Sequence, residues 1–225
     1  MSHVPKVLAA VAAATVVTAT LLVPSGSAPV DAAVPGCAAC PADAKAVAGG
    51  YTLHLDGTVW TWGANAPAQV PGLAGVDGIA ASAKTAYALV DGEVWAWGDN
   101  RDGELGNGAF GGSTATPAKV PGLSDVIAIA AGARTRYALR EDGTVWSWGR
   151  NDRAQLGGLA ERRSASPVRI AGVRGAVEVA AGADSGWAVL ADGTAIAWGA
   201  NDRGQLGSGE ISPRVAIPVP VAAVP

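Results

Sequence analysis

The chain of 225 residues has little charge and few of the side chains that usually carry out chemistry. Charged residues make up 16%, and there are only two His, two Cys, one Phe and one Met. This low charged fraction disfavours long polar helices and disorder driven by charge. The formal net charge of −3 is too small to drive non-specific binding to a nucleic-acid backbone, so we expect no nucleic-acid partner.

The scarcity of His and Cys also argues against catalysis and metal binding. Beyond the N-terminal leader described next, a Ser-His-Asp arrangement depends on His54 alone. A zinc site needs four ligands, and the same part of the chain offers two Cys and one His. The stretches 99–103, 151–153 and 201–204 resemble fragments of calcium loops but lack the remaining carboxylates of an EF-hand. We therefore expect no enzyme, no cofactor and no metal site.

The first 33 residues have the pattern of a secretory signal peptide. His3 and Lys6 form a basic start without acids, residues 7–23 are uncharged, and Pro24-Ser25-Gly26 ends that run. An uncleaved anchor is the alternative, because 17 residues is only marginally short of a membrane span. We predict cleavage, secretion and no later membrane attachment.

The two cysteines follow this leader in a short linker over 34–44. Cys37 and Cys40 reach a compartment in which disulfides persist, so we predict a small local disulfide or an idle pair. A redox motif would need a helix start to depress the thiol pKa, and the sequence shows none. A lipid anchor at Cys37 fits less well, because the preceding residues match a lipobox poorly.

One sequence unit occurs four times over residues 45–225, which we assign to a single repeat domain. DGTVWTWG at 56–63 recurs as DGEVWAWG at 91–98, DGTVWSWG at 142–149 and DGTAIAWG at 192–199. In three copies a second motif follows, which reads NRDGELG, NDRAQLG or NDRGQLG. A Pro-led apolar run comes next, and a segment such as VIAIAAGARTRYAL completes the cycle. The first unit lacks about 15 residues of this cycle. Three motifs in a fixed order indicate a repeat protein.

Each unit predicts four short strands. Asp-Gly before a β-branched run marks a tight hairpin, here joining 136–139 to 145–148. The period of two places both Trp of 145–148 on one face of the strand. Runs such as 127–131 are apolar on both faces and need cover on both sides. Four-stranded sheets stacked around an axis provide that cover, so the sequence predicts an all-β propeller of four blades, either partial or small.

The succession DGxVWxWG, NDxGQLGxG, Pro-led strand and VxxIAAGxxxxxAL resembles the repeat of the regulator of chromosome condensation (RCC1-type) family over about 45–224. The resemblance implies four-stranded blades, usually seven to a ring, and a secreted bacterial member. The founder's nucleotide exchange uses an inserted hairpin and its chromatin binding uses basic elements, and this chain has room for neither. Where the family often has His, the chain has Tyr51, Thr85, Thr135 and Ser185.

The same comparison of units gives a structural interpretation of two residue types. His54 is aligned with Ala88, Ala138 and Ala188, which predicts a strand residue and not a catalytic base. The eight Trp stand at repeat positions inside strands, which predicts core packing over a carbohydrate platform.

Four blades leave the closure of the ring open. The alternatives are a small closed ring, an open arc, a homodimer of two arcs and a truncated gene. The Pro-led run near the C-terminus has no further unit behind it, so we predict that 215–224 pair with a three-stranded first blade, within one chain or between two.

Two classes of function fit this scaffold. The first is a secreted binding protein with an unknown protein partner, which would contact the loops at 83–86, 133–136 and 183–186. The partner-binding candidates in these loops are Lys84, Arg134, Arg136 and Asp184. The second is an enzyme inhibitor, because a secreted bacterial β-lactamase inhibitory protein is similar in using this repeat; that relative, however, carries large aromatics in these loops. A truncated fragment without function is a further alternative.

Overall fold

The computed structural model describes residues 43–62 and 66–222, and this part of the chain contains sixteen strands and no helix. The prediction of an all-β fold is confirmed. Within the described part no segment is a helix of the length and apolar character that crossing a bilayer requires. The predicted signal peptide and the Cys37–Cys40 pair lie outside the described residues.

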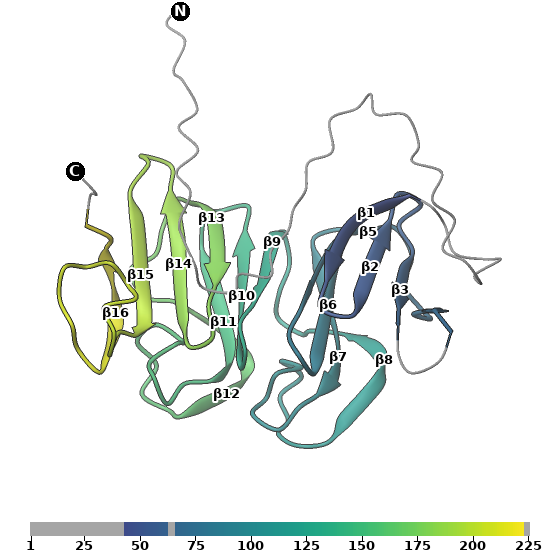
Figure 1. Cartoon of the computed structure of the whole chain (residues 1–225), viewed down its shortest axis with the longest axis horizontal. Helices are drawn as coiled ribbons and strands as arrows, with labels where there is room; N and C mark the ends of the chain where they lie inside the picture. The colour runs from purple at the N-terminus through teal and green to yellow at the C-terminus, as the bar shows by residue number, and fades with distance from the viewer. Residues whose placement is uncertain (1–42, 63–65, 223–225) are drawn as a thin grey trace, which may run out of the picture.

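The strands form four antiparallel sheets of four strands each, and we call these sheets blades 1 to 4 (Figure 1). Blade 1 contains β1 (Ala44–Ala48), β2 (Tyr51–His54), β3 (Val59–Thr61) and β4 (Ala68–Gln69). Blade 2 contains β5 (Val76–Ala81), β6 (Thr85–Val90), β7 (Glu93–Asp99) and β8 (Ser113–Lys119). Blade 3 contains β9 (Val126–Ala131), β10 (Thr135–Arg140), β11 (Val145–Arg150) and β12 (Arg163–Arg169). Blade 4 contains β13 (Ala176–Ala181), β14 (Ser185–Leu190), β15 (Ala195–Ala200) and β16 (Arg214–Pro220).

The blades stand in a row in chain order, with blade 1 and blade 4 at opposite ends (Figure 1). The apolar core consists of three clusters, one at each interface between successive blades. The two faces of β11 divide as the period of two predicts: Trp146 and Trp148 join the cluster with blade 2, and Val145 joins the cluster with blade 4. The fold is therefore a partial β-propeller whose stability resides between its sheets.

The two ends of each blade differ in their connections. One end carries the short loop between the first and second strands and, in blades 2 to 4, the long loop between the third and fourth. We call it the loop end. The other end carries the Asp-Gly hairpin between the second and third strands and the link to the next blade, and we call it the turn end.

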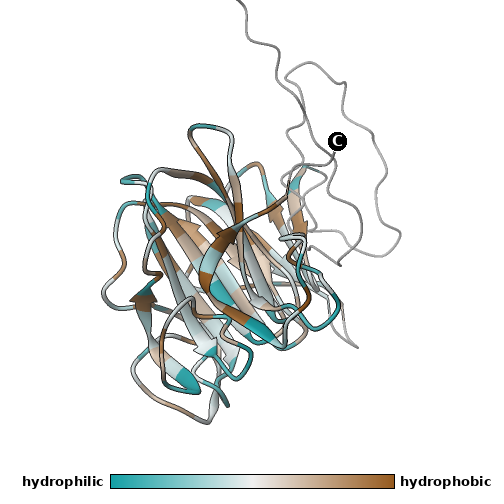
Figure 2. Cartoon of the chain, turned by 90° about the vertical axis from the view of Figure 1, so that its left-hand side faces the viewer, coloured by the Kyte–Doolittle hydropathy of each residue, from teal (hydrophilic) through white to brown (hydrophobic). Residues whose placement is uncertain are grey.

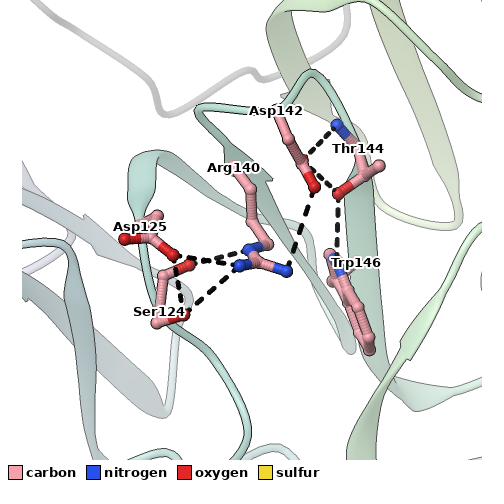
Figure 3. A network of polar contacts seen from close by, with 6 residues as sticks. All are labelled: Ser124, Asp125, Arg140, Asp142, Thr144 and Trp146. Carbon is pink, nitrogen blue, oxygen red and sulfur yellow. Dashed lines mark hydrogen bonds and ion pairs between the residues drawn. The ribbon is translucent and has the colours of Figure 1, made fainter.

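Hydrogen bonds to aspartate explain the Asp-Gly-Thr sequence at the turn end (Figure 3). Asp142 Oδ1 accepts from the backbone N–H and the hydroxyl of Thr144 at 2.9 and 2.6 Å, and Trp146 Nε1 donates to that hydroxyl at 3.2 Å. These bonds lower the pKa of the Asp142 carboxyl. The same arrangement joins Asp56, Thr58 and Trp60 in blade 1. Asx turns of this kind start the third strand in a fixed register.

Arg140 closes the turn end of blade 3. Its Nε donates to the Ser124 carbonyl at 2.8 Å, and its Nη2 lies 3.0 Å from Asp125 Oδ2 (Figure 3). Arg140 is the last residue of β10, so it sits at the opposite end of that strand from Arg136.

The prediction that 215–224 pair with the first unit is wrong. β16 pairs with β15, with Val219 opposite Ala197, and is the outer strand of blade 4. Blade 1 has its own short fourth strand, because β4 pairs with β3. The prediction treated the Pro-led strand as the first strand of a blade, whereas it is the last. The Pro-led strand near the C-terminus therefore completes blade 4 and is not available to blade 1.

The register also corrects the alignment of two residues. Leu53 pairs with Val59 as Leu139 pairs with Val145, so His54 corresponds to Arg140 and not to Ala138. Tyr51 pairs with Thr61 as Tyr137 pairs with Ser147, so Tyr51 belongs with the aromatics Tyr87, Tyr137 and Trp187 and not with Thr135. The sequence comparison missed both because the hairpin between the first two strands is shorter in blade 1: Ala48 pairs with Tyr51, three residues on, whereas Ala130 pairs with Tyr137, seven residues on.

The prediction of core packing holds for the tryptophans of the WG pairs in blades 2 to 4 and fails in blade 1. Trp97, Trp148 and Trp198 are buried against the preceding blade. Trp62, at the same position of blade 1, is 43% exposed among the described residues. At the other end of the row, Figure 2 shows brown apolar segments along the blade that faces the viewer, and Ile217 on β16 is 72% exposed.

Candidate functional site

An edge-to-face aromatic pair is repeated at every interface between blades. Each pair joins the Tyr of one blade to the WG tryptophan of the next, and the ring centroids lie 5.4 Å apart in Tyr51–Trp97, 6.1 Å in Tyr87–Trp148 and 5.5 Å in Tyr137–Trp198. The corresponding interplanar angles are 86°, 73° and 85°. Edge-to-face contact is the geometry that aromatic quadrupoles favour.

At two of these interfaces both rings donate to one carbonyl oxygen. Tyr87 Oη and Trp148 Nε1 lie 2.7 and 2.8 Å from the Glu104 oxygen, and Tyr137 Oη and Trp198 Nε1 both lie 2.9 Å from the Gln155 oxygen. Burial raises the pKa of Tyr87 to about 12, so its hydroxyl keeps its proton and remains a donor. Glu104 and Gln155 stand in the long loops of blades 2 and 3, which fixes those loops against the interface.

An asparagine organises each long loop, which explains the motif that partly resembled a calcium site. Asn100, Asn151 and Asn201 accept from the backbone N–H of the Leu five residues later at 2.9, 2.9 and 3.2 Å. Their Nδ2 groups donate to carbonyls further along the loop, such as that of Ala109 at 3.0 Å. Each Asn side chain is therefore committed to the fold of its own loop.

The glycine of the WG pair in blades 2 to 4 brings the short loop against the third strand. Gly98 has φ +109°, and a Cβ there would lie 2.2 Å from the Lys84 carbonyl oxygen. Because no side chain intervenes, the Asp99 N–H donates to that carbonyl at 3.0 Å. The corresponding bond from Arg150 to the Arg134 carbonyl is 2.9 Å. Lys84 and Arg134 are thus held at the rim of the loop end.

The interface between blades 2 and 3 differs from the others by one buried arginine. Arg136 is 1% exposed and occupies the position, opposite the WG tryptophan, that holds Ala86 in blade 2 and Gly186 in blade 4. Its guanidinium lies over the Tyr87 ring, 5.2 Å from the centroid. The aromatic pair of this interface is also the one with the widest separation of centroids, 6.1 Å.

Arg136 donates only to neutral oxygens within the described part of the chain. Its Nε donates to Tyr87 Oη, its Nη1 to the carbonyls of Gly132 and Thr135 at 3.1 Å each, and its Nη2 to Ser82 Oγ at 3.1 Å. An arginine keeps its proton in proteins, so a positive charge lies here with no carboxylate within ion-pair distance in the described part of the chain. Burying an uncompensated charge is costly, which sets this side chain apart from a packing residue.

A cavity of about 340 Å³ opens at the loop end beside Arg136. It lies between blades 2 and 3, and its lining includes five cations and three carboxylates: Lys84, Arg101, Arg134, Arg136, Arg150, Asp99, Asp102 and Glu104. The lining therefore carries an excess of two positive charges. At the next interface the residues that correspond to Glu104 and Arg134 are bonded to each other, because Gln155 Nε2 donates to Asp184 Oδ1 at 3.0 Å.

The carboxylates of the lining have donors in the protein. Asp99 Oδ1 accepts the Asn100 N–H at 3.0 Å, and Glu104 Oε2 accepts the Asp102 N–H at 2.7 Å. Asp102 Oδ1 lies 3.9 Å from Arg163 Nη1. Of the cations, Arg150 is paired with Asp152, whereas the other four form no ion pair with any residue that the structure describes.

The structure brings three of the four partner-binding candidates to this cavity and separates the fourth from it. Lys84, Arg134 and Arg136 line the cavity, and Asp184 lies at the following interface. Sequence reasoning missed Arg101 and Arg150, which approach from the long loop of blade 2 and the end of β11. The sequence could have indicated these two residues, because the NDR motif and the AAGxxx loop fall at the same end of each blade.

The geometry defines the class of the protein: a β-propeller arc of four blades with the same aromatic pair at each interface between blades. Residues 91–139 and 142–189 match the family model of the Regulator of chromosome condensation (RCC1) repeat, and a second model of that repeat matches 126–155. The models thus match RCC1 repeats from β7 of blade 2 to β14 of blade 4. No curated protein matches the chain.

Solved structures share this fold at low identity. Prp20p from Saccharomyces cerevisiae, described with its binding to Gsp1p and histones, is 24% identical with a TM-score of 0.70, over 77% of this chain and 48% of that one. Yeast RCC1 (Prp20) bound to Kap60 gives the same identity and TM-score, over 77% and 46%. Human WBSCR16 is 22% identical with a TM-score of 0.67, over 76% and 48%. The chain spans about half the length of each of these proteins.

Proposed function

We propose that the chain is a secreted bacterial member of the RCC1-type family that binds a protein partner at the loop end of its blades. The observation that carries this proposal is the cavity between blades 2 and 3, where exposed Lys84 and Arg134 stand over buried Arg136. A rigid sheet scaffold that presents charged loops at one end is typical of binding proteins. The protein complexes in which the yeast relative is described also favour a binding function.

Secretion rests on the composition of residues 1–33, a basic start followed by an uncharged run and a helix-breaking end. Expression of the full chain in a bacterial host with N-terminal sequencing of the product in the medium tests this part. A product that begins after Ala28 or Ala32 supports it. Full-length chain retained in the membrane fraction contradicts it.

The inhibitor alternative gains no support from the rims of these loops. Their exposed residues include Ala83, Lys84, Ala133 and Arg134, where an inhibitor of the known kind presents large aromatics. The binding proposal therefore specifies a charged contact surface.

Site-specific photo-crosslinking tests where a partner binds. A photo-reactive residue replacing Lys84 or Arg134 is exposed to the proteins of the producing culture, and the same residue replacing Asp125 at the turn end is the control. We expect one protein to cross-link at 84 and 134 and not at 125. With that protein purified, Lys84→Ala and Arg134→Ala together weaken its binding by at least about tenfold, since charge pairs at rims set both steering and specificity. Cross-links at 125 alone would contradict the proposal.

We also propose that the outer faces of blades 1 and 4 associate in a homodimer. Trp62 is exposed at the position that the preceding blade covers elsewhere, and Trp187 is half-buried at the position that the following blade covers elsewhere. The two faces are therefore complementary in the repeated interface. Light scattering is expected to give twice the chain mass, and Trp62→Ala is expected to give the monomer; a parent protein that is monomeric at high concentration contradicts this proposal.

A further inference from the structure

We infer that the cavity between blades 2 and 3 is a carboxylate-binding site anchored by Arg136. This inference extends the proposed function and rests on it, because the carboxylate belongs to a polypeptide partner. The ligand chemistry is specific: one carboxylate group, from an acidic side chain or a chain terminus, enters beside the guanidinium.

Arg136 is a long side chain at a position where blades 2 and 4 have small residues. Blades 2 and 4 have Ala86 and Gly186 at its position, and at Gly186 even a Cβ would lie 2.6 Å from the Trp198 ring. The interface therefore does not need a side chain there. In blade 3 the guanidinium occupies this place, and the aromatic centroids are 0.6 Å further apart than those of the Tyr137–Trp198 pair, as their separations of 6.1 and 5.5 Å show.

The charge of the Arg136 guanidinium faces neutral hydrogen-bond partners. The guanidinium gives its hydrogen bonds to a phenol, a hydroxyl and two carbonyls, and none of these compensates its charge. Arginine offers five donors, and four bonds are made, so one N–H remains for a ligand. A carboxylate would supply both the missing acceptor and the missing negative charge, in a place where charge-assisted bonds are strong.

The walls of the cavity carry more positive than negative charge. Its own carboxylates, Asp99, Asp102 and Glu104, are held by neighbouring N–H groups or by Arg163, whereas Lys84, Arg101 and Arg134 form no ion pair in the described part of the chain. The excess of positive charge at the entrance attracts an anion. A volume of about 340 Å³ lies at the lower end of the range for ligand pockets, so the cavity has room for an acidic side chain or a chain terminus.

Three blocked or partly blocked pentapeptides test the inference. The first is acetyl-AAEAA-amide, with one side-chain carboxylate; the second is acetyl-AAQAA-amide, with none; the third is acetyl-AAQAA with a free C-terminal carboxylate. Each is titrated into the ¹⁵N-labelled protein at matched ionic strength while the Nε–H signal of Arg136 and the Nε1–H signal of Trp148 are followed by NMR. Inorganic phosphate is titrated in parallel.

We expect at least one carboxylate peptide to shift both signals in a saturable way, at least about tenfold more tightly than acetyl-AAQAA-amide, since the two differ by one charge-assisted contact. The peptide that binds more tightly identifies the source as side chain or terminus. Arg136→Ala is expected to weaken this binding by at least about tenfold, with Arg140→Ala, on the same strand at the turn end, as the matched control. Because blade 2 has Ala at this position, the Arg136→Ala variant is expected to fold.

Three outcomes overturn the inference: no saturable shift with either carboxylate, equal affinity for acetyl-AAQAA-amide, or phosphate binding as tight as the peptides and unchanged in Arg136→Ala. Each leaves the proposed function standing, because a protein can still bind the rim through Lys84 and Arg134. Conversely, peptide binding at Arg136 without any cross-linked partner at 84 or 134 would defeat the proposed function and leave the carboxylate site intact.

Discussion

The interface between blades 2 and 3 and the interface between blades 3 and 4 share the same aromatic pair but differ in the side chains around it. Both pair a Tyr with a WG tryptophan, and both direct the two ring donors to one loop carbonyl. At the second interface Gly186 packs directly against Trp198, and Gln155 is hydrogen-bonded to Asp184. The first has Arg136, Glu104 and Arg134 at the corresponding positions and retains a cavity. The comparison separates the residues that hold the blades together from those that the fold does not require.

The largest effects are expected where the two interfaces agree. Trp148→Ala and Trp198→Ala each remove a buried indole and its hydrogen bond, so each is expected to lower the free energy of unfolding by about 3–5 kcal/mol. Chemical denaturation measures this effect. Trp62→Ala, which removes the exposed equivalent, is the control and is expected to cost less than about 1 kcal/mol in dilute monomer. Equal losses at Trp62 and Trp198 would show that blade 1 is covered as the others are.

The next effect distinguishes Gly186 from Arg136. Gly186→Ala places a methyl group 2.6 Å from the Trp198 ring, so it is expected to destabilise by about 1–3 kcal/mol through overpacking. Arg136→Ala removes an uncompensated buried charge together with its hydrogen bonds, and these opposing terms are expected to leave a loss below about 1.5 kcal/mol. Thermal and denaturant unfolding of the two variants give the order. A larger loss for Arg136→Ala would make that arginine a structural residue.

These two positions also show how far the sequence could be interpreted. The repeat, its strands and its hairpins follow from DGxVWxWG and the period of two, because those patterns depend on neighbours in the chain. The buried position of Arg136 does not, because a Gly, Ala or Arg in the same motif gives no local signal of what the next blade places against it. The alignment of His54 and the pairing of 215–224 failed for a related reason. The length of the first hairpin in blade 1, and which strand ends each blade, are visible only in the cross-strand register.

An effect of similar size is expected when the Glu of blade 2 replaces the corresponding Gln of blade 3 at the loop end. Gln155→Glu replaces the donor to Asp184 by a second carboxylate and is expected to cost about 1–3 kcal/mol at neutral pH. The loss is expected to shrink as the pH falls and one of the two acids takes up a proton. Gln205→Glu is the matched control, because Gln205 makes the same bonds within its loop and is exposed. If both variants lose the same stability, the bond across the interface contributes nothing.

The smallest effect concerns blade 1. His54 bonds Thr52 through Nε2 at 2.9 Å, its buried Nδ1 has no partner among the described residues, and burial lowers its pKa below 6.5. The unfolded chain therefore binds a proton at a higher pH than the folded one, so stability is full above pH 6.5 and falls as the pH drops below it. His54→Val, which copies Val90 of blade 2, is expected to remove this component of the pH dependence of the unfolding midpoint. An identical pH profile in the variant would contradict it.

A crystal structure of the protein soaked with acetyl-AAEAA-amide, or with the free-terminus peptide if that one binds more tightly, is the most direct test of the difference between the two interfaces. The carboxylate is expected within hydrogen-bond distance of the Arg136 guanidinium, between blades 2 and 3, with the Gln155–Asp184 bond of the next interface intact. Peptide bound only to Lys84 and other surface cations, with Arg136 out of reach, would contradict a carboxylate site and reduce Arg136 to a packing variation within the repeat.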